Sequence, residues 1–313
     1  MFWRFSQFMN DIQMIKMLER PVGVVDMVLD TDAYNEIDDQ FAIAYAIKSP
    51  DRVNLKALYA APFHNANSSG PRDGMEKSYD EILKIVSLAG RDDLADVTFR
   101  GSVSYLPDEK TPVESDAMHD LIERARKYSP EKPLYVAAIG AITNVASAII
   151  AAPDIVDRIV IVWLGGHAHW ARNTREFNMF QDVAAARVIF GCGAPVVQLP
   201  CSGVVSAFYT TKTELEYWLV GKNPLADYLA KNTIAEAESY AAGRVWSRVI
   251  WDVTTIGWLV DRGEGFMSSE LRHAPIPEYD DRYAFDESRH FMRYVSGINR
   301  DALMGDLFAR LTK

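Results

Sequence analysis

The chain has 313 residues, of which 49% are hydrophobic and 24% are charged, the composition of a globular protein with a sizeable buried core. Its 33 basic and 43 acidic residues give a formal net charge of −10, which disfavours nucleic acid or an anionic membrane as a partner, since both attract basic patches. Two cysteines form no disulfide framework and no apolar run reaches about eighteen residues, so we expect a cytoplasmic protein without a membrane span.

Residues 1–20 scatter charges among apolar residues, which predicts an amphipathic N-terminal helix rather than a signal peptide. Strand-like apolar runs then alternate with helical patterns as far as about residue 200. This alternation predicts an α/β fold with an open, mainly parallel sheet and helices on both faces. The predicted strands cover residues 22–29, 53–60, 97–100, 134–138, 159–164 and 195–199. The predicted helices between them cover residues 40–48, 75–89, 115–128, 143–151 and 183–191.

The last third of the chain is predicted to be mainly helical, over residues 213–219, 225–240, 251–260 and 300–311. A short antiparallel extension is expected near residues 283–295. No Gly/Ser linker or shift in composition marks a boundary, so we expect one domain over residues 1–313, with residues 1–20 as a helical extension.

Five acids crowd into ten positions directly after the first predicted strand: Asp30, Asp32, Glu36, Asp38 and Asp39. Carboxylates beside a buried strand are costly unless a positive group compensates them. They stand at a strand's carboxyl end, where open α/β sheets bind ligands. A hard divalent cation with oxygen ligands, calcium or magnesium, fits this pattern best. Taken alone, an acidic pair at a helix start could instead simply favour the helix dipole.

Polar groups also follow three other predicted strands and open one predicted helix. Each has a plain alternative: GAITN at 140–144 as a turn and cap, the histidines as surface loop residues, and Trp251 as a core residue. Their common position favours function, because the carboxyl ends of neighbouring parallel strands open into one crevice. The segments are 62–67, 140–144, 165–178 and 251–252.

Together, the DTD and DD motifs at 30–39, GAITN, GG followed by EFN at 176–178, and a late aspartate resemble the inosine–uridine nucleoside hydrolases over roughly residues 22–260. The resemblance implies an open α/β fold and calcium-dependent cleavage of the N-glycosidic bond of ribonucleosides. It also implies a small-molecule ribosyl substrate and a homodimer or homotetramer.

The resemblance assigns the metal to Asp32, bidentate Asp39, the backbone carbonyl of Thr143, and Asp252. These would supply about five of the six to eight oxygens that calcium takes. Asp32 would also act as general base to the attacking water, with Asp30 behind these ligands to orient them.

The resemblance assigns the sugar to Asp38, Glu176 and Asn178, and it marks Asn178 beside Asp32 as catalytic. The segment after the second strand offers Asn65 as a further ribose contact and His64 as an acid at near-neutral pH. His167 and His169 are weaker candidates for protonating the leaving group.

Two departures from the family pattern concern the substrate. Asp32 and Asp38 are six positions apart where the family usually has four, and the additional loop holds Tyr34, Asn35 and Glu36. Glu36 could point into the site as a substrate contact or face solvent. Trp251 stands where many members have histidine. It cannot donate a proton as histidine can, but it can stack on a base, which favours a purine.

Three hypotheses therefore remain. The first is a calcium-dependent hydrolase of ribonucleosides or of a related N-riboside. The second keeps the fold and metal but acts on another ribosyl compound, accommodated by the loop insertion. The third is a non-catalytic protein that binds a sugar or nucleoside.

Overall fold

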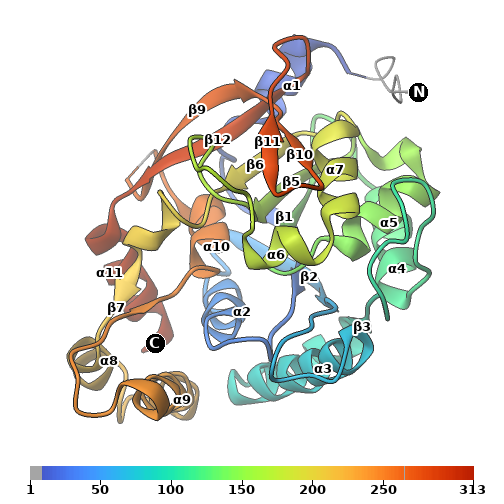
Figure 1. Cartoon of the computed structure of the whole chain (residues 1–313). Coiled ribbons are helices and arrows are strands. Elements are labelled where there is room, and N and C mark those ends of the chain that lie inside the picture. The colour runs from blue at the N-terminus through green and yellow to red at the C-terminus, as the bar shows by residue number, and fades with distance from the viewer. Residues whose placement is uncertain (1–8, 264) are drawn as a thin grey trace.

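The computed structural model describes residues 9–263 and 265–313, and its centre is a sheet of eight strands in the order β3-β2-β1-β4-β5-β6-β12-β9. Neighbours pair in parallel from β3 to β12, and β9 closes the edge antiparallel to β12. Figure 1 shows helices on both sides of this sheet. The predicted open, mainly parallel α/β fold is confirmed.

The helices are α1 (Asp11–Met17), α2 (Asp39–Ile47), α3 (Pro71–Leu88), α4 (Asp116–Ala125), α5 (Thr143–Ala151), α6 (Phe177–Gln181), α7 (Val183–Gly191), α8 (Lys212–Trp218), α9 (Pro224–Ala241), α10 (Val253–Val260) and α11 (Arg300–Leu311). The strands are β1 (Val25–Thr31), β2 (Val53–Ala60), β3 (Thr98–Arg100), β4 (Leu134–Ala138), β5 (Ile159–Leu164), β6 (Val196–Leu199), β7 (Tyr209–Thr210), β8 (Arg248–Val249), β9 (Met267–His273), β10 (Ile276–Glu278), β11 (Arg282–Ala284) and β12 (Phe291–Ile298).

Two hydrophobic clusters cover the two faces of the sheet. One packs α2, α10 and α11 against the sheet, and the other packs α4, α5 and α7 against the opposite face. Strands β4 and β5 are buried along their whole length, which explains their continuous apolar sequences. Burial on both faces leaves the ends of the strands as the places where polar residues can gather.

The chain reverses its direction of travel across the sheet between β1 and β4. Strands β2 and β3 lie on one side of β1, whereas β4, β5 and β6 follow on the other. A reversal of this kind leaves a crevice outside the carboxyl ends of the two central strands, because the connections leave in opposite directions. The acids at 30–39 stand at this point.

Several boundaries differ from the sequence prediction. Strand β1 runs to Thr31 rather than residue 29, because Asp30 pairs with Ala138 of β4 inside the sheet. The antiparallel extension is larger than expected, since β9 and β12 form a long pair and β10 and β11 a separate hairpin. The predicted N-terminal helix is present as α1, while residues 1–8 lie outside the described part. No helix among the described residues is long and apolar enough to cross a membrane.

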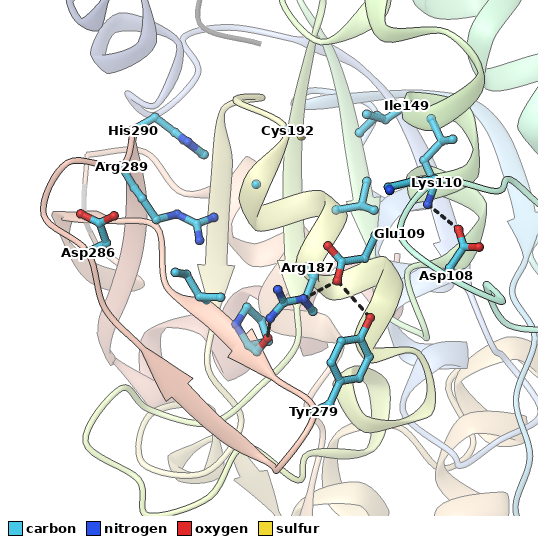
Figure 2. A pocket seen from close by; sticks show the side chains of 15 residues that line it. Asp108, Glu109, Lys110, Ile149, Arg187, Cys192, Tyr279, Asp286, Arg289 and His290 are labelled. Atoms are coloured by element: carbon cyan, nitrogen blue, oxygen red, sulfur yellow. Dashed lines mark hydrogen bonds and ion pairs between the residues drawn. The ribbon is translucent and has the colours of Figure 1, made fainter. Parts of the chain in front are cut away.

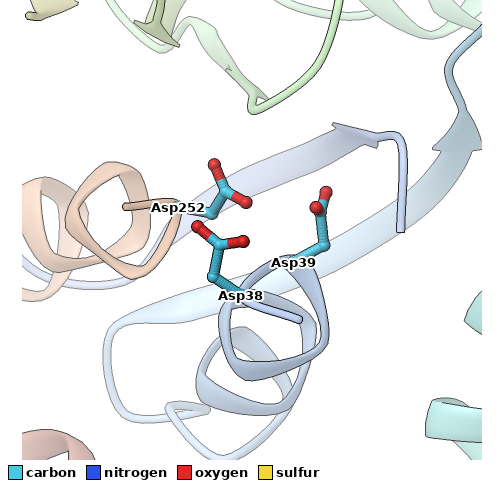
Figure 3. Close-up of side chains that lie close together, drawn as sticks. All are labelled: Asp38, Asp39 and Asp252. Atoms are coloured by element: carbon cyan, nitrogen blue, oxygen red, sulfur yellow. The ribbon is translucent and has the colours of Figure 1, made fainter. Parts of the chain in front are cut away.

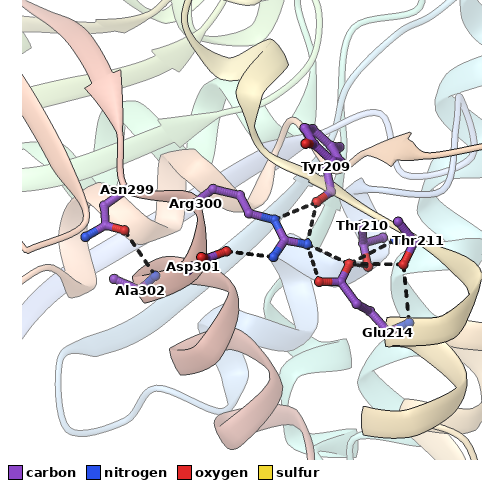
Figure 4. A network of polar contacts seen from close by, with 8 residues as sticks. All are labelled: Tyr209, Thr210, Thr211, Glu214, Asn299, Arg300, Asp301 and Ala302. Atoms are coloured by element: carbon purple, nitrogen blue, oxygen red, sulfur yellow. Dashed lines mark hydrogen bonds and ion pairs between the residues drawn. The ribbon is translucent and has the colours of Figure 1, made fainter.

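A polar network ties the last helix to the segment that leads into the site (Figure 4). Arg300, at the start of α11, donates from Nε and Nη2 to the Tyr209 carbonyl at 3.0 and 2.9 Å and from Nη2 to Glu214 at 2.6 Å. Glu214 completes a capping box with Thr211 at the start of α8. This holds β7, whose antiparallel partner β8 carries Arg248 toward the site.

Candidate active site

Three carboxylates converge at the carboxyl end of β1. Oxygens of Asp38 and Asp39, at the start of α2, and of Asp252, before α10, all lie within 4.8 Å of one another, and all three residues are buried (Figure 3). Two oxygens on opposite sides of a calcium ion are separated by about 4.6–5.2 Å, so this spacing suits one ion. The structure therefore groups Asp38 with Asp39 and Asp252, where the resemblance assigned Asp38 to the sugar.

Asp32 lies beneath this cluster with its charge uncompensated. It has no exposed surface, and neither of its carboxylate oxygens has a hydrogen-bond partner among the described residues. A Cβ on Gly140 of the GAITN segment would lie 3.0 Å from Asp32 Cγ, so that glycine permits the close approach of the two loops. A buried carboxylate without a donor is costly, and a bound cation is the group that would satisfy it.

The acids affect one another electrostatically. Burial is the main cause that raises the pKa values of Asp30, Asp32, Asp38, Asp39 and Asp252, to about 7 for Asp30 and about 6 for Asp39. Neighbouring carboxylates raise the pKa values of Asp32, Asp38 and Asp252 further. These groups cannot all be ionised in a dry site without a positive charge, so the cluster fits a divalent metal ion.

Hydrogen-bond donors from neighbouring residues hold three of the acids in place. The Thr31 hydroxyl donates to Asp39 at 2.5 Å, and the backbone N–H of Trp251 donates to Asp38 at 2.9 Å. Asn144 donates to Asp30 at 2.7 Å, behind the cluster. The Thr143 hydroxyl donates to Asp182, outside the cluster, at 2.7 Å. The Thr143 hydroxyl proton is therefore directed at Asp182 and not at the acid cluster.

Above the acids lies a cavity of about 210 Å³. It is lined by Asn35, Glu36, Asp38, Ile139, Leu164, His167, Arg175, Glu176, Phe177, Asn178, Cys201, Ser202, Trp251 and Asp252. This volume is below the roughly 300–1,000 Å³ of most small-molecule sites. A cavity of this size has room for a group as small as a sugar.

Glu176 and Asn178 are brought into this cavity by the start of α6. The Glu176 carboxylate accepts the backbone N–H groups of Gly166, Asn178 and Met179 at 2.8–3.0 Å, so it caps the helix. The Asn178 amide nitrogen donates to two backbone carbonyls at 3.0 and 3.1 Å. Each side chain is thus held in place, with the single amide oxygen of Asn178 and the outer lone pairs of Glu176 left for a ligand.

Two residues of the loop insertion, Glu36 and Asn35, line the cavity. Glu36 was predicted as a substrate contact or a solvent-facing residue. It lines the cavity and its carboxylate pairs with Arg248 at 2.5 Å. Arg248 also lies 3.5 Å from Glu236 of α9. Its positive charge partly offsets the burial and the neighbouring acids that raise the pKa of Asp38. Arg248 was not singled out from the sequence, since it is 212 positions from Glu36.

Asn35 also lines the cavity, although no role was predicted for it from the sequence. The predicted ribose contact Asn65 does not line the cavity; its amide nitrogen donates to Asn35 Oδ1 at 2.6 Å. His64 is exposed and also lies outside the cavity lining, with its backbone N–H donating to Gln181.

The two histidines that follow β5, His167 and His169, lie in different surroundings. His167 lines the cavity, and its Nδ1 accepts the Ser202 N–H at 3.3 Å, which places the ring proton on Nε2. His169 points away: it pairs with Gln198 at 2.8 Å and packs among Tyr283, Phe285 and Tyr294. Trp251 lines the cavity and packs against the core.

A second, larger cavity of about 680 Å³ lies between α5, α7 and the β10–β11 hairpin (Figure 2). Its Arg187 donates to Glu109 at 2.6 Å, to Glu278 at 3.0 Å and to the Pro277 carbonyl at 2.7 Å. The charge of Arg187 is therefore balanced by two carboxylates.

Arg289 in the same cavity donates to the Phe190 carbonyl in the last turn of α7 at 2.5 Å. A cation there offsets the negative end of the helix dipole. This accounts for Arg289 as a cap, so the larger cavity is not the candidate active site.

Comparisons with known proteins agree with the chemistry of the smaller cavity. The family model described as inosine-uridine preferring nucleoside hydrolase matches residues 27–282. The chain is 28% identical over 228 residues to the probable uridine nucleosidase 2 of Arabidopsis thaliana, covering 66% of this chain and 67% of that protein. It is 25% identical over 319 residues to the pyrimidine-specific ribonucleoside hydrolase RihA of Klebsiella pneumoniae, covering 91% and 97%.

Among solved structures, a purine-preferring ribonucleoside hydrolase from Gardnerella vaginalis superposes with a TM-score of 0.73 at 20% identity. The superposition covers 92% of this chain and 98% of that one, and it shows a shared fold. The family model spans most of the chain, including every acid of the cluster. The chain therefore belongs to the inosine-uridine preferring nucleoside hydrolase family, whose enzymes hydrolyse the N-glycosidic bond of ribonucleosides.

Proposed function

We propose that this chain is a calcium-dependent ribonucleoside hydrolase that favours purine bases. The observation that supports it most directly is the Asp32 carboxylate, which is fully buried beside three other acids and receives no hydrogen bond from the part of the chain that the structure describes. Oxygen-only ligands favour calcium or magnesium, and the flexible arrangement of several carboxylates suits calcium better than the strict octahedron of magnesium.

Asp32, Asp39, Asp252 and the Thr143 carbonyl would hold the ion, with Asp38 at its edge. When bound, the ion lowers the pKa of a water molecule and orients it. Asp32 would accept the proton that this water loses, since its charge has no competing donor among the described residues.

The sugar would lie over the acids, with Asp38, Glu176 and Asn178 as acceptors for its hydroxyl groups. As the bond to the base breaks, positive charge develops on the sugar ring, and the carboxylates beneath it stabilise that charge. Trp251 would stack on the departing base, and base–aromatic stacking is worth about 1–3 kcal/mol. The larger purine face gains more from this contact, which is the basis of the proposed preference.

A substrate panel with metal control tests the proposal. The chelated protein is assayed for ribose release from inosine, guanosine, uridine and cytidine, before and after calcium or magnesium is added back. We expect turnover only with metal, calcium above magnesium, and higher kcat/KM for the purines. A pyrimidine preference would overturn the role of Trp251, and full activity in the chelated protein would overturn the metal.

The loop insertion favours a second candidate, a hydrolase of another ribosyl compound. Glu36 and Asn35 both line the cavity of about 210 Å³, and a cavity of this size restricts what can be attached to the sugar. Under this alternative, all four nucleosides remain uncut while free ribose still binds with calcium in calorimetry.

A further inference from the structure

The insertion places Asn35 where the substrate would lie. Asn35 is 8% exposed and lines the cavity together with Asp38 and Asp252. Its backbone N–H donates to the Asp32 carbonyl at 2.7 Å, so the same short loop positions both Asn35 and the general base.

The β2–α3 loop holds the acceptor side of Asn35. Asn65 Nδ2 donates to Asn35 Oδ1 at 2.6 Å, and Asn67 Nδ2 donates to the Asn35 carbonyl at 2.9 Å. With Oδ1 fixed in this way, the amide can present only its Nδ2 group to the cavity. That group makes no hydrogen bond to another residue in the described part of the chain.

The other side of the loop is held by the ion pair between Glu36 and Arg248. Arg248 is 17% exposed and lies between Glu36 at 2.5 Å and Glu236 at 3.5 Å. Two long-range attachments, one on each side of Asn35, hold the insertion in one conformation. A group ordered before binding loses little entropy when a ligand arrives.

The residues proposed to hold the sugar, Asp38, Glu176 and Asn178, offer it acceptors, and Asn35 adds a donor beside them. A hydroxyl group both donates and accepts, whereas ionised carboxylates only accept. The amide nitrogen of Asn178 already donates to the Ile139 and Leu164 carbonyls, and Arg248 is paired with acids. A sugar hydroxyl that donates to Asp38 therefore still needs a donor for its own oxygen.

We propose that Asn35 Nδ2 donates to a hydroxyl group of the sugar, and that Asn65 acts through Asn35 as a positioning residue. This inference rests on the proposed function and adds to it the residue that contacts the sugar. Because the contact is with the sugar, its loss affects substrates with different bases equally.

The test is a double-mutant cycle of Asn35→Ala and Asn65→Ala, with Asn54→Ala as control. Asn54 is an exposed asparagine bonded to Asp26, at the other end of β2. The readouts are kcat/KM for inosine and uridine and the Kd of ribose by calorimetry with calcium. Loss of one hydrogen bond predicts a roughly tenfold fall in kcat/KM for Asn35→Ala, equal for both nucleosides, and a matching rise in Kd.

Asn65→Ala should lower kcat/KM less, and should have no further effect once Asn35 is alanine. An undiminished effect of Asn65→Ala in that background overturns the inference, because Asn65 would then contact the sugar itself. Wild-type behaviour of Asn35→Asp, which keeps the acceptor for Asn65 but removes the donor, also overturns it.

The ribose measurement separates this inference from the proposed function. A wild-type protein that cleaves no nucleoside but binds ribose contradicts the proposed reaction alone, and the same cycle is then read in Kd. A protein that neither cleaves nor binds ribose overturns both.

Discussion

The two cavities of this molecule differ in how their charges are balanced. The larger one, about 680 Å³, contains arginines that are each matched by a carboxylate or a helix end. The smaller one, about 210 Å³, lies over four acids, and among the described residues none donates a hydrogen bond to the Asp32 carboxylate. The difference teaches that the capacity to bind a ligand depends on polar groups without a partner more than on the volume of a cavity. A charged group that is already paired within the protein has no interaction left to offer a ligand.

The largest expected effect is on turnover, when the unsatisfied acid is neutralised. Asp32→Asn should lower kcat by about 10³-fold or more, since it removes both a general base and a metal ligand. The metal-free variant should be as stable as the wild type or more so, because a buried charge has been removed. Steady-state kinetics and thermal unfolding measure the two quantities.

The matched control is Asp108→Asn, which changes the same residue type in the larger cavity. Its turnover should equal that of the wild type. A comparable loss of turnover in both variants would contradict the distinction between the two cavities.

Metal binding should reverse the pH dependence of stability. In the metal-free protein the pKa of Asp39 is raised to about 6 and that of Asp30 to about 7, mainly by burial. The folded state then binds more protons than the unfolded state above pH 4. Stability should therefore fall as the pH rises from about 4 through 7.

Calcium should restore stability above pH 7, by about 2.7 kcal/mol at a hundredfold excess over Kd. Denaturant unfolding with and without calcium at pH 5 and pH 8 gives the four values needed. Equal stabilities at pH 8 with and without the ion would argue against a metal at this site.

A smaller effect, on stability alone, is expected in the larger cavity. Arg187→Met should lower the free energy of unfolding by about 1–3 kcal/mol, because Glu109 and Glu278 lose their partner in a half-buried place. Activity per folded molecule should not change. Urea unfolding and kcat on the same preparation test this, and a fall in kcat without a fall in stability would contradict it.

The smallest effect concerns the two buried thiols, one in each cavity lining. Burial raises the pKa of Cys192 to about 11, and burial together with the Glu176 carboxylate raises the pKa of Cys201 well above its ordinary value. Little thiolate is present at pH 8, so both should react with iodoacetamide much more slowly than in the unfolded chain. Mass spectrometry of timed samples should find Cys201 the slower; faster labelling of Cys201 would contradict the acidic surroundings described for it.

Local sequence was sufficient for much of the fold. Helices α5, α7 and α11 match their predicted ranges, because apolar periodicity within each segment determines which face is buried. The end of β1 was misplaced by two residues, since aspartate is depleted in strands and Asp30 reads as a loop residue. Its place in the sheet depends on Asn144, more than a hundred positions later.

The same limit applies to the site. The order of the motifs along the sequence was sufficient to predict that the acids, Glu176, Asn178 and Trp251 share one site. All of them line the cavity or lie next to it. The pairing of Glu36 with Arg248 and of Asn65 with Asn35 could not be predicted, because no periodicity or motif relates residues that meet only through the tertiary fold. The antiparallel partner β9 was missed for the same reason.

The β1–α2 loop has one further consequence, for how substrate range can diverge in such an enzyme. The loop begins at Asp32 and ends at Asp38 and Asp39, so a bound ion would fasten both of its ends. Lengthening a fastened loop from four to six residues costs only about 0.4 kcal/mol of closure entropy. The residues between Asp32 and Asp38 can thus be substituted or increased in number. Such changes would alter the side chains that face the substrate without displacing the acids at the two ends of the loop.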